Sequence, residues 1–274
     1  MKIDGKKIAD EILEDCSKFE KPKKFFSAVL VGDDSASISF LRQKEIVAKK
    51  LGIDFRIFKF PSQIKNDELR KEVLKIASHK TCGGVIVQLP LPSHLNQHYI
   101  LNVIPVEKDV DVLSERALGA FYVGRSKVLP PAVGVVKHIC EKQNYDISSF
   151  RVGIVGLGIL VGRPIANWIM RKAKETIFLR SVSDLSLLKD VDLVITGVGK
   201  ALMLKPNMLK DDATIIDFGY GVDQKSDKLI LKGDFDYEKL SDETNISYTP
   251  TPRGTGPVLV AKLFENFLIL NSLE

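Results

Sequence analysis

The sequence is poor in the residues that build metal centres and disulfide frameworks. Its 274 residues include only three cysteines and four histidines. Cys16, Cys82 and Cys140 stand far apart without a C-x-x-C pair, which argues against a structural zinc site and a disulfide scaffold. His94 and His98 are four residues apart, but no third ligand stands near them, so we assign them a surface or capping role. We therefore predict no metal and a reducing, cytoplasmic compartment.

The sequence also has little excess of one charge over the other. Lys and Arg number 40 and Asp and Glu 35, a net charge of +5 with the two signs interspersed. This pattern excludes a basic arm for nucleic acid, and we assign the basic run at 21–24 to a solvated turn. The first residues carry frequent charges and no apolar h-region, so we expect no signal peptide. With 45% hydrophobic and 27% charged residues, the composition fits a soluble globular protein without a membrane partner.

What the sequence does contain is an alternation of strand and helix patterns. The run over 25–31 is typical of a strand buried on both faces, and a helix capped by Ser35 or Ser37 should follow and end at Gly52. Strands separated by helices of 10 to 15 residues predict right-handed βαβ units and a parallel sheet. The further elements expected in this half are a strand over 53–60, a helix over 66–78 and a strand over 83–87.

A second block repeats the alternation, and the length suits two modest domains. A strand over 151–155 enters a glycine-rich turn, and a helix should start near Pro164. We expect the other elements of this block at 131–144 (helix), 176–180, 191–196 and 213–217 (strands) and 254–271 (helix). Such a terminal helix often packs back on the first domain.

The segment GIVGLGILVGRP resembles a dinucleotide cradle, in which backbone N–H groups at a helix start face a pyrophosphate. Gly156, Gly158 and Gly162 give G-x-G-x-x-x-G, one residue longer than the usual fingerprint, so a merely tight turn is the alternative. The next strand ends in Arg180 and Ser181 rather than in an acidic residue. A cation and a hydroxyl there suit a ribose 2′-phosphate and favour NADP, unless Arg180 is simply solvated.

Several polar groups of the first half stand where parallel sheets place ligands. Phe40 and Lys44, four residues apart, project from one helical face. Gln88 follows a buried strand directly, at the ligand edge of an open sheet. Asp109 and Asp111 share a face if their segment is extended. The alternatives are a solvated lysine, a turn-stabilising glutamine, and a cap beside a solvated acid.

Together these segments resemble one family over nearly the whole chain. VQLPLPSHL, ILNVIPVEKDVD, GILVGRP, VDLVITGVGK, ATIIDFGYG and TPTPRGTGP occur in the order seen in the bifunctional methylenetetrahydrofolate dehydrogenase/methenyltetrahydrofolate cyclohydrolase family. The resemblance implies a two-domain α/β fold: a folate domain (1–130 with 252–274) closed by the C-terminal helix, and a Rossmann-type domain (131–251). It implies oxidation of methylenetetrahydrofolate with NADP, hydrolysis of the methenyl product to formyltetrahydrofolate, and a homodimer.

The resemblance also assigns site residues by position. The family's catalytic lysine falls on Lys44, its glutamine on Gln88 and its folate-anchoring aspartate on Asp111. The substrate-binding positions it implies are Phe40, Val87, Leu89, Pro252, Gly254, Gly256 and Pro257. The cofactor-binding positions it implies are Gly156, Leu157, Gly158, Gly162, Arg180, Ser181 and Tyr220.

Several departures from the family pattern lie inside these motifs. The family has tyrosine at Phe40, glycine at Val112, arginine at Leu157, glycine at Arg253 and threonine at Leu259. Two other interpretations therefore stay open. One is a catalytically impaired or non-catalytic descendant that keeps the fold. The other is a different NAD(P)-dependent dehydrogenase, acting for example on an amino acid or a shikimate-like acid.

Overall fold

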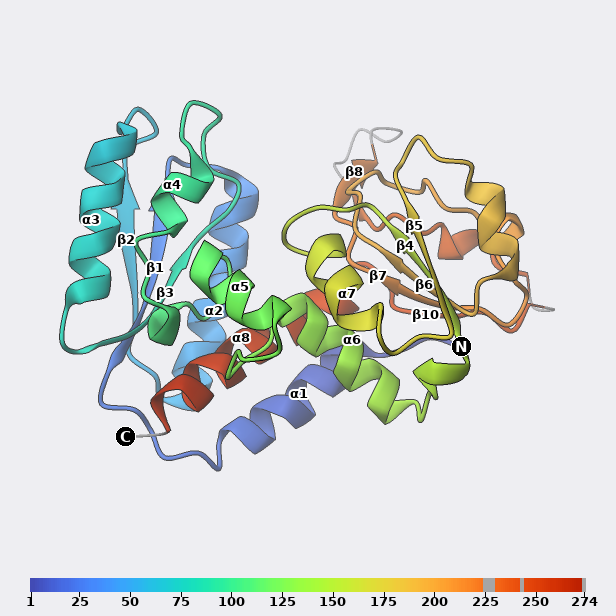
Figure 1. Ribbon diagram of the computed structural model, residues 1–274, viewed down its shortest axis with the longest axis horizontal. Helices are drawn as coiled ribbons and strands as arrows, with labels where there is room; N and C mark the ends of the chain where they lie inside the picture. The colour runs from blue at the N-terminus through green and yellow to red at the C-terminus, as the bar shows by residue number, and fades with distance from the viewer. Residues whose placement is uncertain (224–229, 242–243, 273–274) are drawn as a thin grey trace. The chain divides into compact units, whose positions relative to one another are not determined.

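A computed structural model describes residues 1–223, 230–241 and 244–272 (Figure 1). Internal contacts divide the chain into two compact units. We call Glu11–Pro131 with Val260–Glu274 the three-stranded unit, and Met1–Asp10 with Ala132–Leu259 the five-stranded unit. In the described residues no helix is both long and apolar enough to cross a membrane.

The three-stranded unit is built on a parallel sheet of order β2-β1-β3. Its first βαβ segment runs through α2, whose N-cap is Asp34, because its carboxylate accepts the Ser37 N–H at 2.8 Å. The predicted cap at Ser35 or Ser37 is therefore wrong by one to three residues, whereas Gly52 ends the helix at φ +68° as expected. The elements are β1 Phe25–Val31, α2 Ser35–Leu51, β2 Phe55–Phe60, α3 Asn66–Ser78, β3 Cys82–Val87, α4 Gln97–Leu101, η1 Val106–Lys108 and α5 Glu115–Tyr122.

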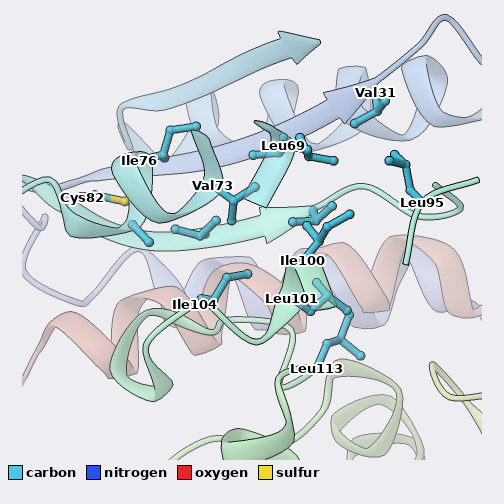
Figure 2. Packing of buried hydrophobic residues seen from close by; sticks show 14 of the residues in the cluster. Val31, Leu69, Val73, Ile76, Cys82, Leu95, Ile100, Leu101, Ile104 and Leu113 are labelled. Atoms are coloured by element: carbon cyan, nitrogen blue, oxygen red, sulfur yellow. The ribbon is translucent and has the colours of Figure 1, made fainter. Parts of the chain in front are cut away.

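Both faces of this sheet are covered. Alternate residues of β1 point to opposite faces, and Val29 and Val31 pack with Leu69 and Val73 of α3 in the core drawn in Figure 2. On the other face the Phe26 ring stacks on Phe267 of α8 (Thr255–Asn271) with centroids 4.7 Å apart. The sheet is thus the middle of three layers, which explains why β1 is buried along its whole length.

The five-stranded unit has a parallel sheet of order β10-β7-β6-β4-β5, and an antiparallel pair, β8 with β9, beside it. Strand β4, which lies between β6 and the edge strand β5, leads into the glycine-rich turn and α7, so this turn lies at the carboxyl edge of the sheet. The elements are α6 Pro131–Lys142, η2 Ile147–Ser149, β4 Arg151–Val155, α7 Gly162–Ile169, β5 Glu175–Leu179, η3 Leu185–Asp190, β6 Leu193–Thr196, η4 Pro206–Met208, β7 Thr214–Asp217, β8 Gly221–Asp223, β9 Ile230–Lys232, η5 Tyr237–Lys239 and β10 Ser247–Tyr248.

The predicted two-domain α/β fold with parallel sheets is confirmed, and the first residues of the chain group with the five-stranded unit. The Ile3 N–H donates to the Tyr248 carbonyl at 2.8 Å, and the Tyr248 N–H donates to the Met1 carbonyl at 2.9 Å. The N-terminus therefore extends the five-stranded sheet beside β10, and the division between units falls inside α1 (Gly5–Cys16) and α8. The boundaries 1–130 with 252–274 and 131–251 stay a prediction.

Candidate functional site

The three residues that the resemblance assigns to catalysis all lie in the three-stranded unit. Lys44 projects from the middle of α2, and its Nζ donates to Gln88 Oε1 at 2.9 Å. Gln88 follows β3, and its own Nε2 donates to the Leu89 carbonyl at 2.9 Å. These two bonds fix the orientation of the amide, because its oxygen must face the lysine. Burial lowers the pKa of Lys44, and the negative charge of Asp111 opposes that shift.

Asp109 and Asp111 have separate roles in a turn that follows η1. The Asp109 carboxylate is buried and accepts the N–H groups of Leu113 and Ser114 at 3.0 and 2.7 Å. Asp111 is half-buried, and its charge interacts with Lys44. Burial raises the pKa of Asp111 to about 6; Lys44 opposes the shift, and Asp109 adds to it. The segment is a turn and not extended, so the condition under which both carboxylates would share a face is not met. Asp109 caps the turn, and Asp111 interacts electrostatically with Lys44.

The substrate positions predicted in this unit lie close in the sequence to Lys44 or to Gln88. Phe40 is half-buried one helical turn before Lys44, so its ring lies on the same side of α2. Val87 is buried as the last residue of β3, and Leu89 packs partly against the core. Their contact with a substrate stays a prediction.

Two of the departures from the family pattern fall on strained backbone. Val112 has φ +57° and Arg253 has φ +76°, in the left-handed region that favours glycine. These are two positions at which the resemblance expects glycine, so the fold keeps the glycine conformation while the side chain has changed. A β-branched residue in this region is an outlier and costs about 1–3 kcal/mol. Val112 is buried, whereas Arg253 is exposed.

The glycine-rich turn after β4 has the geometry of a phosphate cradle. Gly156 has φ +91°, and its N–H donates to Leu179 of β5 at 2.8 Å. A Cβ at Gly162 would overlap the Gly156 carbonyl oxygen, whereas a Cβ at Gly158 would meet nothing within 4 Å. The N-cap of α7 is Val161, whose side chain has no acceptor for the first N–H groups. Backbone N–H groups at a helix start beside open space suit an anion, so this turn fits a pyrophosphate.

The other predicted cofactor residues also lie in the five-stranded unit. Arg180 and Ser181 directly follow β5 and are exposed, as is Tyr220 between β7 and β8. Leu157 is half-buried in the turn, and the Nε of Arg163 donates to its carbonyl at 2.9 Å. The structure therefore brings these residues to the carboxyl side of one sheet, while their contact with a nucleotide stays a prediction.

The predicted folate-side segment is partly helical. Pro252 precedes the strained Arg253, and Gly254 is buried where a Cβ would overlap the Pro250 carbonyl oxygen. Gly256 and Pro257 lie in the first turn of α8, not in a loop. By its contacts the segment up to Leu259 belongs to the five-stranded unit.

Sequence reasoning missed two buried carboxylates of the five-stranded unit. Asp234 accepts Thr196 Oγ1 at 2.7 Å and the N–H groups of Val198 and Lys200, both at 2.8 Å. Asp217 accepts the N–H groups of Gly219 at 2.6 Å and Phe235 at 2.9 Å. The pair thus orders the loops that follow β6 and β7. The available signal was an acid beside a phenylalanine in each segment, in IIDFG and GDFD.

The chain matches two family models. Residues 3–111 match the model described as tetrahydrofolate dehydrogenase/cyclohydrolase, catalytic domain, and residues 130–273 match the NAD(P)-binding domain of the same name. A curated relative, the bifunctional protein FolD of Staphylococcus aureus (strain JH9), is 29% identical over 280 residues, which cover 99% of this chain and 96% of the relative.

Solved structures agree in fold over the whole chain. The bifunctional enzyme FolD, a methylenetetrahydrofolate dehydrogenase/cyclohydrolase from Campylobacter jejuni, has a TM-score of 0.90 at 26% identity, covering 99% of this chain and 98% of that one. The corresponding enzyme of Trypanosoma brucei, solved with NADP and an inhibitor, has a TM-score of 0.91 at 23% identity, covering 98% and 96%. The second likeness is one of fold alone.

Proposed function

Because this chain belongs to the tetrahydrofolate dehydrogenase/cyclohydrolase family, we propose that it oxidises methylenetetrahydrofolate to methenyltetrahydrofolate with NADP and hydrolyses the product to formyltetrahydrofolate in one-carbon metabolism. The observation that carries this proposal is the Lys44–Gln88 hydrogen bond beside the Asp111 carboxylate. A different dehydrogenase activity would not require this group of residues, and the family match sets that interpretation aside.

The first half-reaction depends mainly on alignment. A nicotinamide cofactor supplies the hydride acceptor, and the glycine turn with Arg180, Ser181 and Tyr220 are the residues that would hold it. On the substrate side the Phe40 ring provides an apolar face for a pterin, and Asp111 provides an acceptor for its N–H groups. Fixing the substrate between such groups accounts for a large share of the rate, because orientation replaces a bimolecular encounter.

The second half-reaction needs proton transfers. Water adds to the methenyl cation, and the ring then opens when a proton reaches the departing nitrogen. Lys44 is suited to move these protons because burial lowers its pKa toward neutrality. Gln88 orients the amine through its Oε1. A cationic substrate beside Lys44 disfavours the ammonium further, so binding itself favours the neutral base.

Three finer features of the proposal concern specificity, location and assembly. NADP is preferred to NAD because Arg180 and Ser181 follow β5, where a 2′-phosphate would meet a cation and a hydroxyl. A cytoplasmic location suits Cys16, Cys82 and Cys140, which are buried free thiols. A homodimer suits the edge of the three-stranded sheet, where β2 is paired on one side by β1 among the described residues.

A spectrophotometric assay of the purified chain tests the function. We expect methylenetetrahydrofolate and NADP to give methenyltetrahydrofolate and NADPH, and methenyltetrahydrofolate alone to be hydrolysed. Lys44→Met should lower hydrolysis by about 10²- to 10⁴-fold while NADP affinity stays within about twofold. Lys49→Met, at an exposed lysine of the same helix, is the matched control and should leave both unchanged.

The outcomes separate the remaining alternatives. Hydrolysis that survives Lys44→Met would remove this lysine from the mechanism. A wild-type chain that binds NADP but turns over neither substrate would contradict the proposal and identify a non-catalytic descendant.

A further inference from the structure

One side chain of the C-terminal helix is bonded to the turn that carries Asp111. Asn266 of α8 is 4% exposed, and its Nδ2 donates to the carbonyl oxygens of Val110 and Leu129 at 2.9 and 2.8 Å. The Val110 carbonyl directly precedes the Asp111 residue. A buried amide that satisfies two carbonyls fixes their positions, because an unpaired buried carbonyl would be costly.

The same turn is held from the strand side. Asp109 forms a parallel bridge with Val85 of β3. A Cβ on Gly84 would lie 2.6 Å from the Val110 side chain and 2.8 Å from the Phe267 ring, so the bare glycine lets both pack closely on the strand. At Val110 the turn therefore packs between β3 and α8.

This enclosure explains how the strained residue after Asp111 is tolerated. Val112 keeps φ +57° although it is a buried, β-branched residue. Strained residues persist only when the surrounding structure over-determines them. The Asn266 hydrogen bonds and the Asp109 cap constrain the turn on both sides of Val112.

We infer that Asn266 is a positioning residue, which holds the 109–113 turn so that the Asp111 carboxylate faces Lys44 and the folate. The inference rests on the proposed function, since it concerns how Asp111 is placed for that reaction. Asn266 acts through Val110, and we assign it no contact with the substrate.

The charges around this site make the inference measurable. Asp111 faces Lys44 of α2 and Asp109 of its own turn, and Lys44 faces Asp111 and the uncharged Gln88 amide. Asp111 raises the pKa of Lys44 against burial, and Lys44 lowers the pKa of Asp111. If Asp111 moves away, the pKa of Lys44 falls and that of Asp111 rises, so the contributions of the two groups to the pH profile shift in opposite directions.

The test compares two asparagines of the same helix. Asn266→Leu removes both N–H donors of the side-chain amide and keeps a side chain of similar volume. Asn271→Leu is the matched control, because Asn271 Nδ2 also donates to two carbonyls, those of Gly83 and Phe267, away from Asp111. We expect Asn266→Leu to lower kcat/KM for methenyltetrahydrofolate hydrolysis by about 10- to 100-fold and to shift its pH profile, because the pKa of Lys44 falls while that of Asp111 rises. NADP affinity should stay within about twofold, and Asn271→Leu should change thermal stability without changing the kinetics.

The result that overturns the inference is an Asn266→Leu chain that is less stable than wild type but keeps its kcat/KM within about twofold and its pH profile unshifted. Asn266→Ser, which keeps one short donor, replaces the leucine variant if that one does not fold, and the same two results then decide. Activity of the wild type is measured first. Its absence would contradict the proposed function, whereas wild-type activity with an unaffected Asn266 variant contradicts only the positioning role.

Discussion

Phe40 is the residue whose change bears most directly on chemistry. In the family a tyrosine hydroxyl at this position holds the lysine, and here Lys44 is bonded to Gln88 instead. A phenyl ring is still able to stack on a pterin, so we expect hydride transfer to be preserved and proton transfer by a less constrained lysine to be slower. We expect cyclohydrolase activity to be weak relative to dehydrogenase activity.

Phe40→Tyr should therefore raise methenyltetrahydrofolate hydrolysis, by up to about tenfold because only orientation is regained, with little change in substrate affinity. Phe40→Leu is the control, because it removes the ring and should weaken both activities. Rates are compared at saturating substrate. Hydrolysis that is unchanged or lower in Phe40→Tyr would show that Gln88 alone holds the lysine.

Arg180 carries the prediction on cofactor choice. A charge-assisted hydrogen bond to a 2′-phosphate is worth about 1.5–3 kcal/mol, roughly 10- to 150-fold in affinity. Arg180→Ala should therefore weaken NADP by that factor and leave NAD nearly unchanged in equilibrium titrations. Arg171→Ala, at another exposed arginine of the five-stranded unit, serves as the control. Equal losses for both nucleotides would mean that Leu157 has already shifted the specificity toward NAD.

At the scale of elements, the ends of β6 and β7 are tied together by two carboxylates. A Cβ on Gly219 would overlap the Asp234 carboxylate and a Cβ on Gly233 would overlap that of Asp217, so each acid fits against a glycine beside the other. Burial and the neighbouring Asp234 raise the pKa of Asp217 to about 7, against the N–H groups that it accepts. The Asp217 carboxyl therefore titrates near neutral pH in the folded chain.

The raised pKa of Asp217 predicts a pH dependence of stability. The folded-state pKa of Asp217 lies above its value of about 3.9 in an unfolded chain, so its contribution to stability is full below that value. The contribution is lost as the pH rises through about 7. Asp217→Asn should remove this slope, at the constant cost of one backbone hydrogen bond. Denaturant unfolding at pH 5, 6, 7 and 8 measures both slopes; parallel curves for the two proteins would contradict the assignment.

At the scale of the whole molecule, the edge strand β2 supports a homodimer. The N–H groups of Phe26 and Gly32 donate to the carbonyls of Asp54 and Phe60, so even-numbered residues of β2 turn their backbone toward β1. Phe55, Ile57 and Lys59 therefore direct their N–H and C=O groups to the outer edge. Such an edge is a ready site for pairing with a second chain.

Light scattering after size exclusion should give about twice the chain mass of 30.5 kDa. Lys59→Pro removes an outward N–H without removing a bond to β1, so it should shift the mass toward the monomer. Lys59→Ala, which keeps the N–H, should leave the mass unchanged. A monomeric wild type, or a Lys59→Pro chain that stays dimeric, would exclude pairing through this edge.

The sequence by itself determined what depends on short-range pattern. The apolar run of β1, the four-residue spacing of Phe40 and Lys44 on α2, and the left-handed Gly52 that ends this helix are properties of neighbouring residues. The glycine turn belongs to the same class, because Gly156 and Gly162 are needed by a backbone that folds on itself within a few residues.

Only the tertiary structure decided which groups meet across long separations. The bond from Lys44 to Gln88 joins residues 44 positions apart, and that from Asn266 to Val110 spans 156. The strand register and the packing of α8 set these contacts, and neither leaves a local signature. The same reason distinguishes Asp109 from Asp111. Their separation of two residues in the sequence does not indicate that Asp109 caps the turn while Asp111 interacts with Lys44, because the folding of the turn decides this.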